Sequence, residues 1–303
     1  MLSQIEPFVN EKLDKFIIHK NFALDIQKGL AELYKKPNGE LKSKAYNILE
    51  CGTALEFEHY FNAENTRTLH GANFCKHKLC PMCAWRWHIK QSMILQKAFD
   101  ILGEQDYYHL VLTIPNIKHM TKEFLVELRK KATKFMVKVA KSSDYFLSFE
   151  ITIDERGYYH PHYHIIYINR LEKPLTRKKI QTEWAKIANT GTDYAIGMQK
   201  KCRGDKIAFE LTKYILKFEG IKPTATTLKT IDTATWNIKK ISTKGIIRDA
   251  KIKAEEELEK ERFDKMNELK QYDYELEFYR WLETSYVQEE KRVRKCSTKN
   301  STT

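Results

Sequence analysis

The 303-residue sequence has no long apolar run, and none of its stretches approaches the roughly 20 residues needed to cross a bilayer. Acidic residues follow soon after Met1, at Glu6, Glu11 and Asp14, so the N-terminal stretch lacks the apolar core of a signal peptide. Internal repeats and glycine-rich phosphate loops are also missing from the sequence. We therefore expect a cytoplasmic protein that folds around its own core and has no membrane partner.

The lack of an export signal bears on the six cysteines, at positions 51, 75, 80, 83, 202 and 296. Disulfides are rare in the reducing interior of a cell, where closely spaced cysteines bind metal instead. Three of the cysteines form a C-x4-C-x2-C pattern: Cys75, Cys80 and Cys83. A C-x2-C turn before a helix aims two thiolates at one tetrahedral centre, which predicts a structural Zn2+ site. We expect Cys51 to be the fourth ligand, with His77 and His70 as alternatives, and buried free thiols as the competing interpretation.

Positive charge is in excess throughout the sequence. The formal net charge is +13, Lys and Arg recur along most of the chain, and 12% of the residues are aromatic. No amphipathic segment gathers the basic residues, so a nucleic acid fits this pattern better than a membrane surface. Charge alone leaves solubility as an equally good explanation.

Polar and apolar residues alternate over residues 146–165, which predicts two strands joined at Asp154–Gly157. A three-residue loop with a left-handed Gly157 would pair Asp154 with Tyr158 and set Glu150 opposite His162. One face then carries Ser148, Glu150, Thr152, His160, His162 and His164. The other face carries an apolar set, formed by Leu147, Phe149, Ile151, Ile153, Tyr163 and Ile165.

Neutral imidazoles beside a carboxylate match the ligands of a divalent metal. The register favours Glu150 as the third ligand beside His162 and His164, and His160 competes with it because it shares the face. The alternative interpretation is a row of satisfied or solvated polar residues on an exposed strand.

A second stretch, residues 207–218, has apolar residues at helical spacing: Ile207, Leu211, Ile215 and Phe218. Beside this stripe, Glu210, Tyr214 and Lys217 would fall on one face of the helix at positions i, i+4 and i+7. Taken alone, these three residues fit a solvated helix surface equally well.

The order of predicted elements indicates an α+β fold with four segments. We expect an N-terminal helical arm (1–50), a cysteine-rich zinc-binding segment with the helix that follows it (51–102), a catalytic domain (103–245) and a helical C-terminal region with a disordered tail (246–303). Within them, helices are predicted over 85–102, 121–141, 176–188 and 246–269, and strands over 107–114, 194–198 and 236–242.

Four motifs follow one another in a recognisable order. They are Cys80–Arg86 (CPMCAWR), Leu112–Asn116 (LTIPN), His160–His164 (HPHYH) and Glu210–Lys217 (ELTKYILK). In this order the chain resembles, over most of residues 51–290, the plasmid rolling-circle replication initiators of Gram-positive bacteria. These belong to the HUH endonucleases. The resemblance implies an antiparallel sheet of about five strands flanked by helices, with central histidines and a tyrosine on a nearby helix.

The resemblance also implies residue roles. His162 and His164 match the metal-binding histidines, Tyr214 the nucleophile, Lys217 the lysine of the Tyr-x-x-Lys motif and Glu210 a glutamate one turn before the tyrosine. Mg2+ or Mn2+ would act as Lewis acid on the scissile phosphate. Attack by the tyrosine would give a 5′-phosphotyrosine and a free 3′-hydroxyl, and the glutamate would serve as base in the closing step.

The implied partners are single-stranded or cruciform origin DNA, a host helicase and a DNA polymerase. The sequence does not decide whether the protein also forms a homo-oligomer. A transposase or conjugative relaxase with the same chemistry is one alternative. A non-catalytic, zinc-containing DNA-binding regulator is another, although it has no need for Tyr214-x-x-Lys217 beside a histidine pair.

Overall fold

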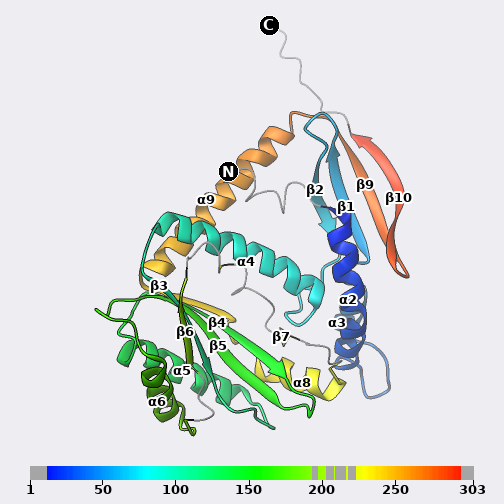
Figure 1. Ribbon diagram of the computed structural model, residues 1–303. Coiled ribbons are helices and arrows are strands. Elements are labelled where there is room, and N and C mark those ends of the chain that lie inside the picture. Colours follow the sequence, from blue (N-terminus) through cyan, green and yellow to red (C-terminus); the bar gives the residue numbers. More distant parts are fainter. Residues whose placement is uncertain (1–11, 193–196, 203–207, 209–215, 218–222, 295–303) are drawn as a thin grey trace. The chain divides into compact units, whose positions relative to one another are not determined.

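The computed structural model describes residues 12–192, 197–202, 208, 216–217 and 223–294 (Figure 1). The chain divides into two compact units, one formed by residues 1–85 with 256–303 and the other by residues 86–255. Two long helices, α4 (Pro81–Leu102) and α9 (Gly245–Leu269), contribute residues to both units. Each unit has its own sheet, so the predicted α+β class is confirmed.

The first unit contains a four-stranded antiparallel sheet in the order β10-β9-β1-β2. Its strands are β1 (Ala54–Tyr60), β2 (Thr66–Ala72), β9 (Tyr274–Leu282) and β10 (Ser285–Arg294). The N-terminal segment supplies α2 (Leu13–Glu32) and α3 (Ser43–Leu49), in agreement with its helical periodicity. Phe16 of α2 makes edge-to-face contacts with Phe57 and Trp85, so α2 is part of this unit's core.

The C-terminal region is helical only up to Leu269, and β9 and β10 follow, which corrects the expectation for its second half. The pairing of β9 with β1 joins segments about 220 residues apart in the chain, which local periodicity does not reveal. Among the aromatic residues of this segment, Tyr286 is buried and Tyr279 makes an edge-to-face contact with the buried Phe57.

The second unit contains a six-stranded sheet in the order β6-β3-β5-β4-β7, with β8 also pairing with β4. Its strands are β3 (Tyr107–Thr113), β4 (Tyr145–Ile153), β5 (Tyr159–Ile168), β6 (Gly197–Lys201), β7 (Leu216–Lys217) and β8 (Ile241–Lys244). All pairs are antiparallel except β4 with β7. The helices α5 (Lys122–Lys138), α6 (Arg177–Ala188) and α8 (Ala225–Ala234) complete it. Thr121 and Thr176 cap α5 and α6 as expected of N-cap residues.

The β4–β5 hairpin has the predicted register, with Glu150 opposite His162. Gly157 has φ of 78°, and the Asp154 amide donates to the Tyr158 carbonyl over 3.0 Å. The Asp154 carboxylate accepts from the Tyr158 amide and from the Arg156 guanidinium, which hold its pKa well below the usual range, and it also accepts the Arg156 amide. Asp154 therefore closes the loop from both its backbone and its side chain.

The two faces of this hairpin differ less in burial than the alternation of polar and apolar residues predicts. The apolar face is buried, and α5 and α6 lie on one side of the sheet (Figure 1). The indole of Trp184 in α6 donates to the Thr113 carbonyl over 2.6 Å. The histidine face is also core at one end, where a buried cluster brings together Leu95, Phe99, Tyr107, Phe146, Ile166, Ile168 and Ile247. The histidines thus occupy one end of a face whose other end is packed under α4 and α9.

The predicted helix over 207–218 fails at its end, because Leu216 and Lys217 form β7 and pair in parallel with Ile151 and Thr152. On the same edge of β4, β8 pairs with residues 145–148. One edge of β4 is thus shared by two short strands, and Glu150 falls between their pairings. Pairing with this edge overrides the local helical pattern.

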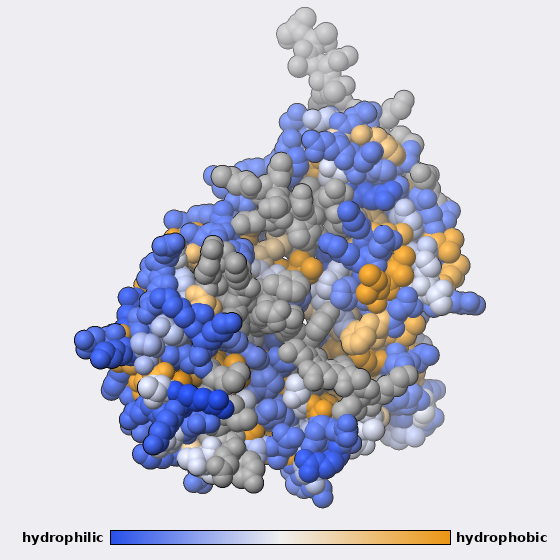
Figure 2. Space-filling view, in the orientation of Figure 1, coloured by the Kyte–Doolittle hydropathy of each residue, from blue (hydrophilic) through white to orange (hydrophobic). Residues whose placement is uncertain are grey.

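Among the described helices, none combines the length and the apolar character that a membrane crossing requires. Hydrophilic residues cover most of the described surface in the view of Figure 2, and hydrophobic residues form small patches between them.

Replacing Gly245 tests how α9 is anchored. Gly245 has φ of +59°, and an added Cβ would overlap Asp144 Oδ1, which accepts the Ile246 amide, and lie 2.8 Å from the Ser143 carbonyl oxygen. We expect Gly245→Ala to lower the free energy of unfolding by about 3 kcal/mol, from left-handed strain plus the lost cap.

Gly103→Ala is the control, because its φ is +64° and nothing lies within 4 Å of its added Cβ. It should cost about 1–2 kcal/mol, from backbone strain alone. Urea denaturation of both variants gives the comparison, and equal losses would contradict the role given to Asp144.

Candidate functional site

The β4–β5 hairpin and its neighbours bring Glu150, His162 and His164 together, with one possible ligand atom from each within 4.8 Å of the others. Glu150 Oε2 lies 3.7 Å from His162 Nε2 and 3.3 Å from His164 Nε2. Ligand atoms bound about 2.1 Å from one ion lie roughly 3.0–3.5 Å apart, so these spacings suit a metal after small adjustments. Glu150 is 4% exposed, whereas the side chain of His164 is 23% exposed, so the group is accessible from one side.

Both imidazoles are held through their Nδ1 atoms. His162 Nδ1 lies 3.1 Å from the carbonyl oxygen of His160, which can only accept, so His162 carries its proton on Nδ1. His164 Nδ1 lies 3.1 Å from His109 Nε2, and the two rings stack with centroids 5.3 Å apart. When His164 donates through Nδ1, both Nε2 lone pairs are directed towards Glu150 Oε2, as metal ligation requires.

His164 Nε2 supports this interpretation independently. It is buried and makes no hydrogen bond within the part of the chain that the structure describes. Such an unsatisfied polar atom is costly to bury, and a metal ion would satisfy it. The residues present therefore fit a divalent ion.

His160 is not a member of this group of described residues. Its Nδ1 lies 3.5 Å from Thr152 Oγ1, and burial, together with the neighbouring His162, lowers its pKa. Of the two third ligands considered from the sequence, the geometry favours Glu150.

His109 is a site residue that sequence reasoning missed. It lies on β3, and β3 pairs with β5 so that His109 stands opposite Ile166, on the histidine face. The only local signal was a histidine within a strand-like segment, and the pairing that brings it to His164 joins strands more than 50 residues apart.

Glu210 and Tyr214 lie outside the described residues. For Lys217 the structure describes the backbone, which pairs with Thr152 in β7, two residues beyond Glu150 on β4. The predicted helical relation between Lys217 and the other two residues does not extend to Lys217 itself, because Lys217 is in a strand. The backbone of Lys217, the last residue of the Tyr-x-x-Lys motif, therefore lies beside the strand that carries Glu150.

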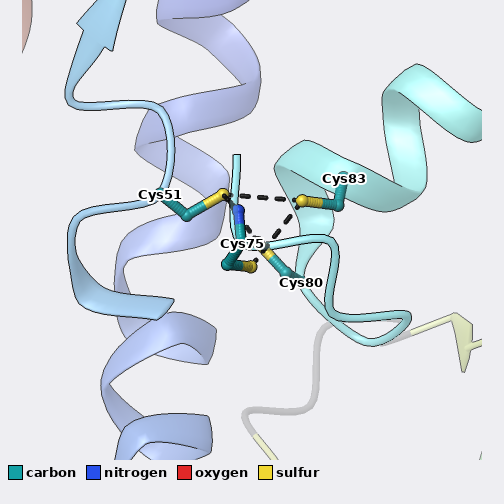
Figure 3. A group of neighbouring side chains, drawn as sticks. All are labelled: Cys51, Cys75, Cys80 and Cys83. Carbon is teal, nitrogen blue, oxygen red and sulfur yellow. Dashed lines mark hydrogen bonds between the residues drawn. The ribbon is translucent and has the colours of Figure 1, made fainter. Parts of the chain in front are cut away.

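The second group consists of Cys51, Cys75, Cys80 and Cys83, whose sulfurs face one another (Figure 3). The sulfur of Cys51 lies 3.5 Å from that of Cys83 and 3.6 Å from that of Cys80, and those of Cys75 and Cys83 are 3.7 Å apart. Four thiolates bound at 2.3 Å around a tetrahedral ion stand about 3.8 Å apart. The spacing therefore fits a four-coordinate metal, and Cys51 is the residue that completes it.

The two alternative ligands are engaged elsewhere. His77 Nε2 lies 3.1 Å from the Tyr34 hydroxyl and its Nδ1 accepts the Leu79 amide. His70 Nδ1 lies 2.9 Å from Glu58 Oε1.

A fully buried lysine, Lys20 of α2, lies beside the cysteines. Its ammonium donates to the Cys51 carbonyl and to Gln27 Oε1, and Gln27 donates in turn to the Cys80 sulfur. Among the described residues Lys20 has no carboxylate partner at ion-pair distance, and burial lowers its pKa. A buried cation needs a nearby negative charge, and thiolates provide one.

The four thiols shift one another's pKa in opposite directions. Hydrogen bonds from the other three lower the pKa of Cys80, whereas hydrogen bonds with them raise the pKa of Cys83. Cys80 is therefore the thiolate that faces Gln27 and Lys20. Cys51 and Cys80 are completely buried, and the other two cysteines of the group are partly buried.

Comparison with known proteins adds to this geometry. The chain is 35% identical over 133 residues to Protein rep of Bacillus amyloliquefaciens, covering 41% of this chain and 38% of that protein. It is 31% identical over 157 residues to Protein rep of Lentilactobacillus hilgardii, with 48% of each chain covered. With Protein rep of Staphylococcus aureus it shares 26% identity over 184 residues, which span 55% of this chain and 79% of that one.

The chain thus spans less than half the length of the first two relatives. No solved structure matches it significantly. The family model Rep_1, described as replication protein, matches residues 66–291, well over half of the chain, and includes the histidine hairpin and three of the four cysteines. On this match, the chain belongs to the Rep_1 family of replication proteins.

Proposed function

We propose that this protein is a plasmid rolling-circle replication initiator, which nicks one DNA strand at its origin and rejoins it. The observation that carries the proposal is the group of Glu150, His162 and His164, in a chain of a replication-protein family. A second observation supports the proposal: Lys217 of strand β7 pairs with Thr152, two residues beyond Glu150 on β4.

The three residues would hold Mg2+ or Mn2+, which supplies a Lewis acid for the scissile phosphate. The chain's own part is to fix the ligands. Glu150 is held by its strand register, His162 by the His160 carbonyl and His164 by His109, so the site is formed before DNA binds.

Tyr214 would be the nucleophile. Its oxygen attacks the phosphorus, the bond from phosphorus to the 3′-oxygen breaks, and the 3′-oxygen leaves with a proton as a hydroxyl that can prime a polymerase. The phosphorus is then bonded to the tyrosine oxygen and keeps its bond to the 5′-oxygen of the DNA, which conserves the bond energy for rejoining. Two residues lie between Tyr214 and Lys217, so their Cα atoms are at most about 11 Å apart, and Lys217 would stabilise the phenolate or the phosphate charge.

Glu210 would act as base in the closing step, for a water or for a second attacking hydroxyl. With a single tyrosine in the motif, a carboxylate that activates a different nucleophile lets the protein finish replication without a second covalent cycle. The proposed partners are single-stranded or cruciform origin DNA, a host helicase and polymerase in the cytoplasm, and a second copy of the chain.

The four cysteines would bind a structural Zn2+. In the resulting centre, four thiolates and one dication carry a net charge of −2, which the Lys20 ammonium partly balances. The ion would join the segments before β1, after β2 and at the start of α4.

Tyr214→Phe tests the nicking reaction. We expect it to abolish the covalent adduct with single-stranded origin DNA, because the nucleophilic oxygen is removed, while DNA affinity changes less than about twofold. A denaturing gel detects the adduct, and the exposed Tyr46, changed to Phe, is the matched control. Nicking by Tyr214→Phe would exclude the assignment.

His164→Ala tests the metal group. We expect Mn2+ affinity, measured by calorimetry without DNA, to fall by at least about a hundredfold, and His109→Ala to lower it by a smaller factor of about ten because His109 orients His164. The exposed His119, changed to Ala, controls for loss of a surface imidazole. Unchanged Mn2+ binding by His164→Ala would contradict the site.

Cys80→Ser tests the zinc centre. We expect the purified protein to lose its one equivalent of zinc, as measured by elemental analysis, and to melt at a lower temperature because metal binding contributes folding energy. Cys202→Ser, at a free cysteine of the second unit, should keep the full zinc content. Equal zinc contents in the two variants would rule out the centre.

A further inference from the structure

The second unit has a pocket of about 560 Å³ that is lined by an unusual set of side chains. Four are cationic and one is a tryptophan: Lys239, Lys240, Arg248, Lys251 and Trp87. The rest of its lining is neutral, so no acidic side chain is among the described residues that form the pocket. We call it the Trp87 groove.

Positive charge remains in excess when the neighbouring acids are included. Arg248 pairs with Asp249 and Lys251 with Glu255, both through partly or fully exposed side chains. Exposed pairs of this kind are weak and exchange readily for a phosphate partner. Lys239 and Arg248 are exposed, so their charges are available to an anion outside the protein.

Trp87 adds an aromatic surface to this charge. It is 37% exposed, and the ammonium of Lys240 lies 5.0 Å from its ring centre. An exposed indole beside cations is poorly explained by solubility, whereas nucleic-acid bases stack on such rings and their phosphates bind the cations.

The groove adjoins the metal-binding group along β4. The amide of Phe149, the residue next to Glu150, donates to the Lys240 carbonyl over 3.0 Å. Trp87 is on α4, the helix whose Leu95 and Phe99 pack against Phe146 on the histidine face of the sheet. A polyanion whose phosphate lies at the histidines can therefore continue into the groove on the same face.

We propose that the Trp87 groove binds single-stranded DNA next to the scissile phosphate, with the exposed Lys239 and Arg248 on phosphates and one base stacked on Trp87, whose ring the buried Lys240 supports. This inference rests on the proposed nicking function, and it assigns the strand's path beyond the metal-binding group. The contacts would be independent of sequence, because phosphates and aromatic stacking do not distinguish bases.

The test is binding of a 20-nucleotide oligothymidylate, measured by fluorescence anisotropy over a range of salt concentrations. Lys239→Ala with Arg248→Ala should weaken binding at least tenfold at low salt and reduce the slope of log K against log salt by about 1.4, or 0.7 for each lost phosphate contact. The control pair is Arg177→Ala with Lys178→Ala, which removes the same two residue types from an exposed helix start in the same unit. It should change both quantities much less.

Trp87 is tested separately. Trp87→Ala should weaken binding about fivefold or more with an unchanged salt slope, and Trp87→Phe should restore most of the affinity. Circular dichroism and melting curves establish that both variants are folded. The double variant Lys239→Ala with Arg248→Ala is called the groove pair. If the groove pair and the control pair lose the same affinity, bulk charge explains the binding and the proposal is overturned. Full affinity in the groove pair would also overturn it.

Nicking of origin DNA by the unaltered protein is measured in parallel. If the protein does not nick while the groove pair loses oligothymidylate binding, the groove proposal is supported and the nicking function is contradicted. If nicking occurs and the groove pair binds normally, the nicking function is supported and the groove proposal is contradicted.

Discussion

The register of the β4–β5 hairpin is the constraint on which the candidate site depends. A shift of one residue would turn every side chain of one strand to the opposite face, so Glu150 would no longer meet His162. The loop fixes that register through Gly157 and the Asp154 carboxylate, and the buried apolar face penalises any slip. The stability of the core and the geometry of the ligands therefore have the same cause.

The two candidate metal-binding groups differ in the chemistry of their ligands. The cysteine group offers four sulfurs and has a buried cation, Lys20, beside it, as expected for a structural centre. The histidine group offers two imidazoles and a carboxylate, and the partly exposed His164 leaves it accessible from one side. In the proposed roles, the soft ligand set would serve the architecture of the chain and the harder set its chemistry.

Sequence reasoning succeeded where the pattern is local. The hairpin register, the helices α5 and α6 and the C-x4-C-x2-C group of cysteines all depend on spacing within short segments, and Cys51 is the most distant residue that was added correctly to its group. It failed where distant strands pair. The strand β9, the strand β7 and the contact of His109 with His164 arise from pairings across tens to hundreds of residues, which no local periodicity encodes. The strand β10 is a local hairpin partner of β9 and is missed together with it. The roles of Glu210 and Tyr214 stay predictions.

The shared edge of β4 has a consequence for how such proteins diversify. Glu150 is held in register by β5 on one side, while on the other side β8 ends its pairing before it and β7 begins beyond it. The strand β8, which carries none of the candidate site residues, can lengthen, shorten or carry an insertion without moving the carboxylate, because β5 sets its position. The freedom to vary at this edge is therefore on the β8 side, since β7 carries Lys217.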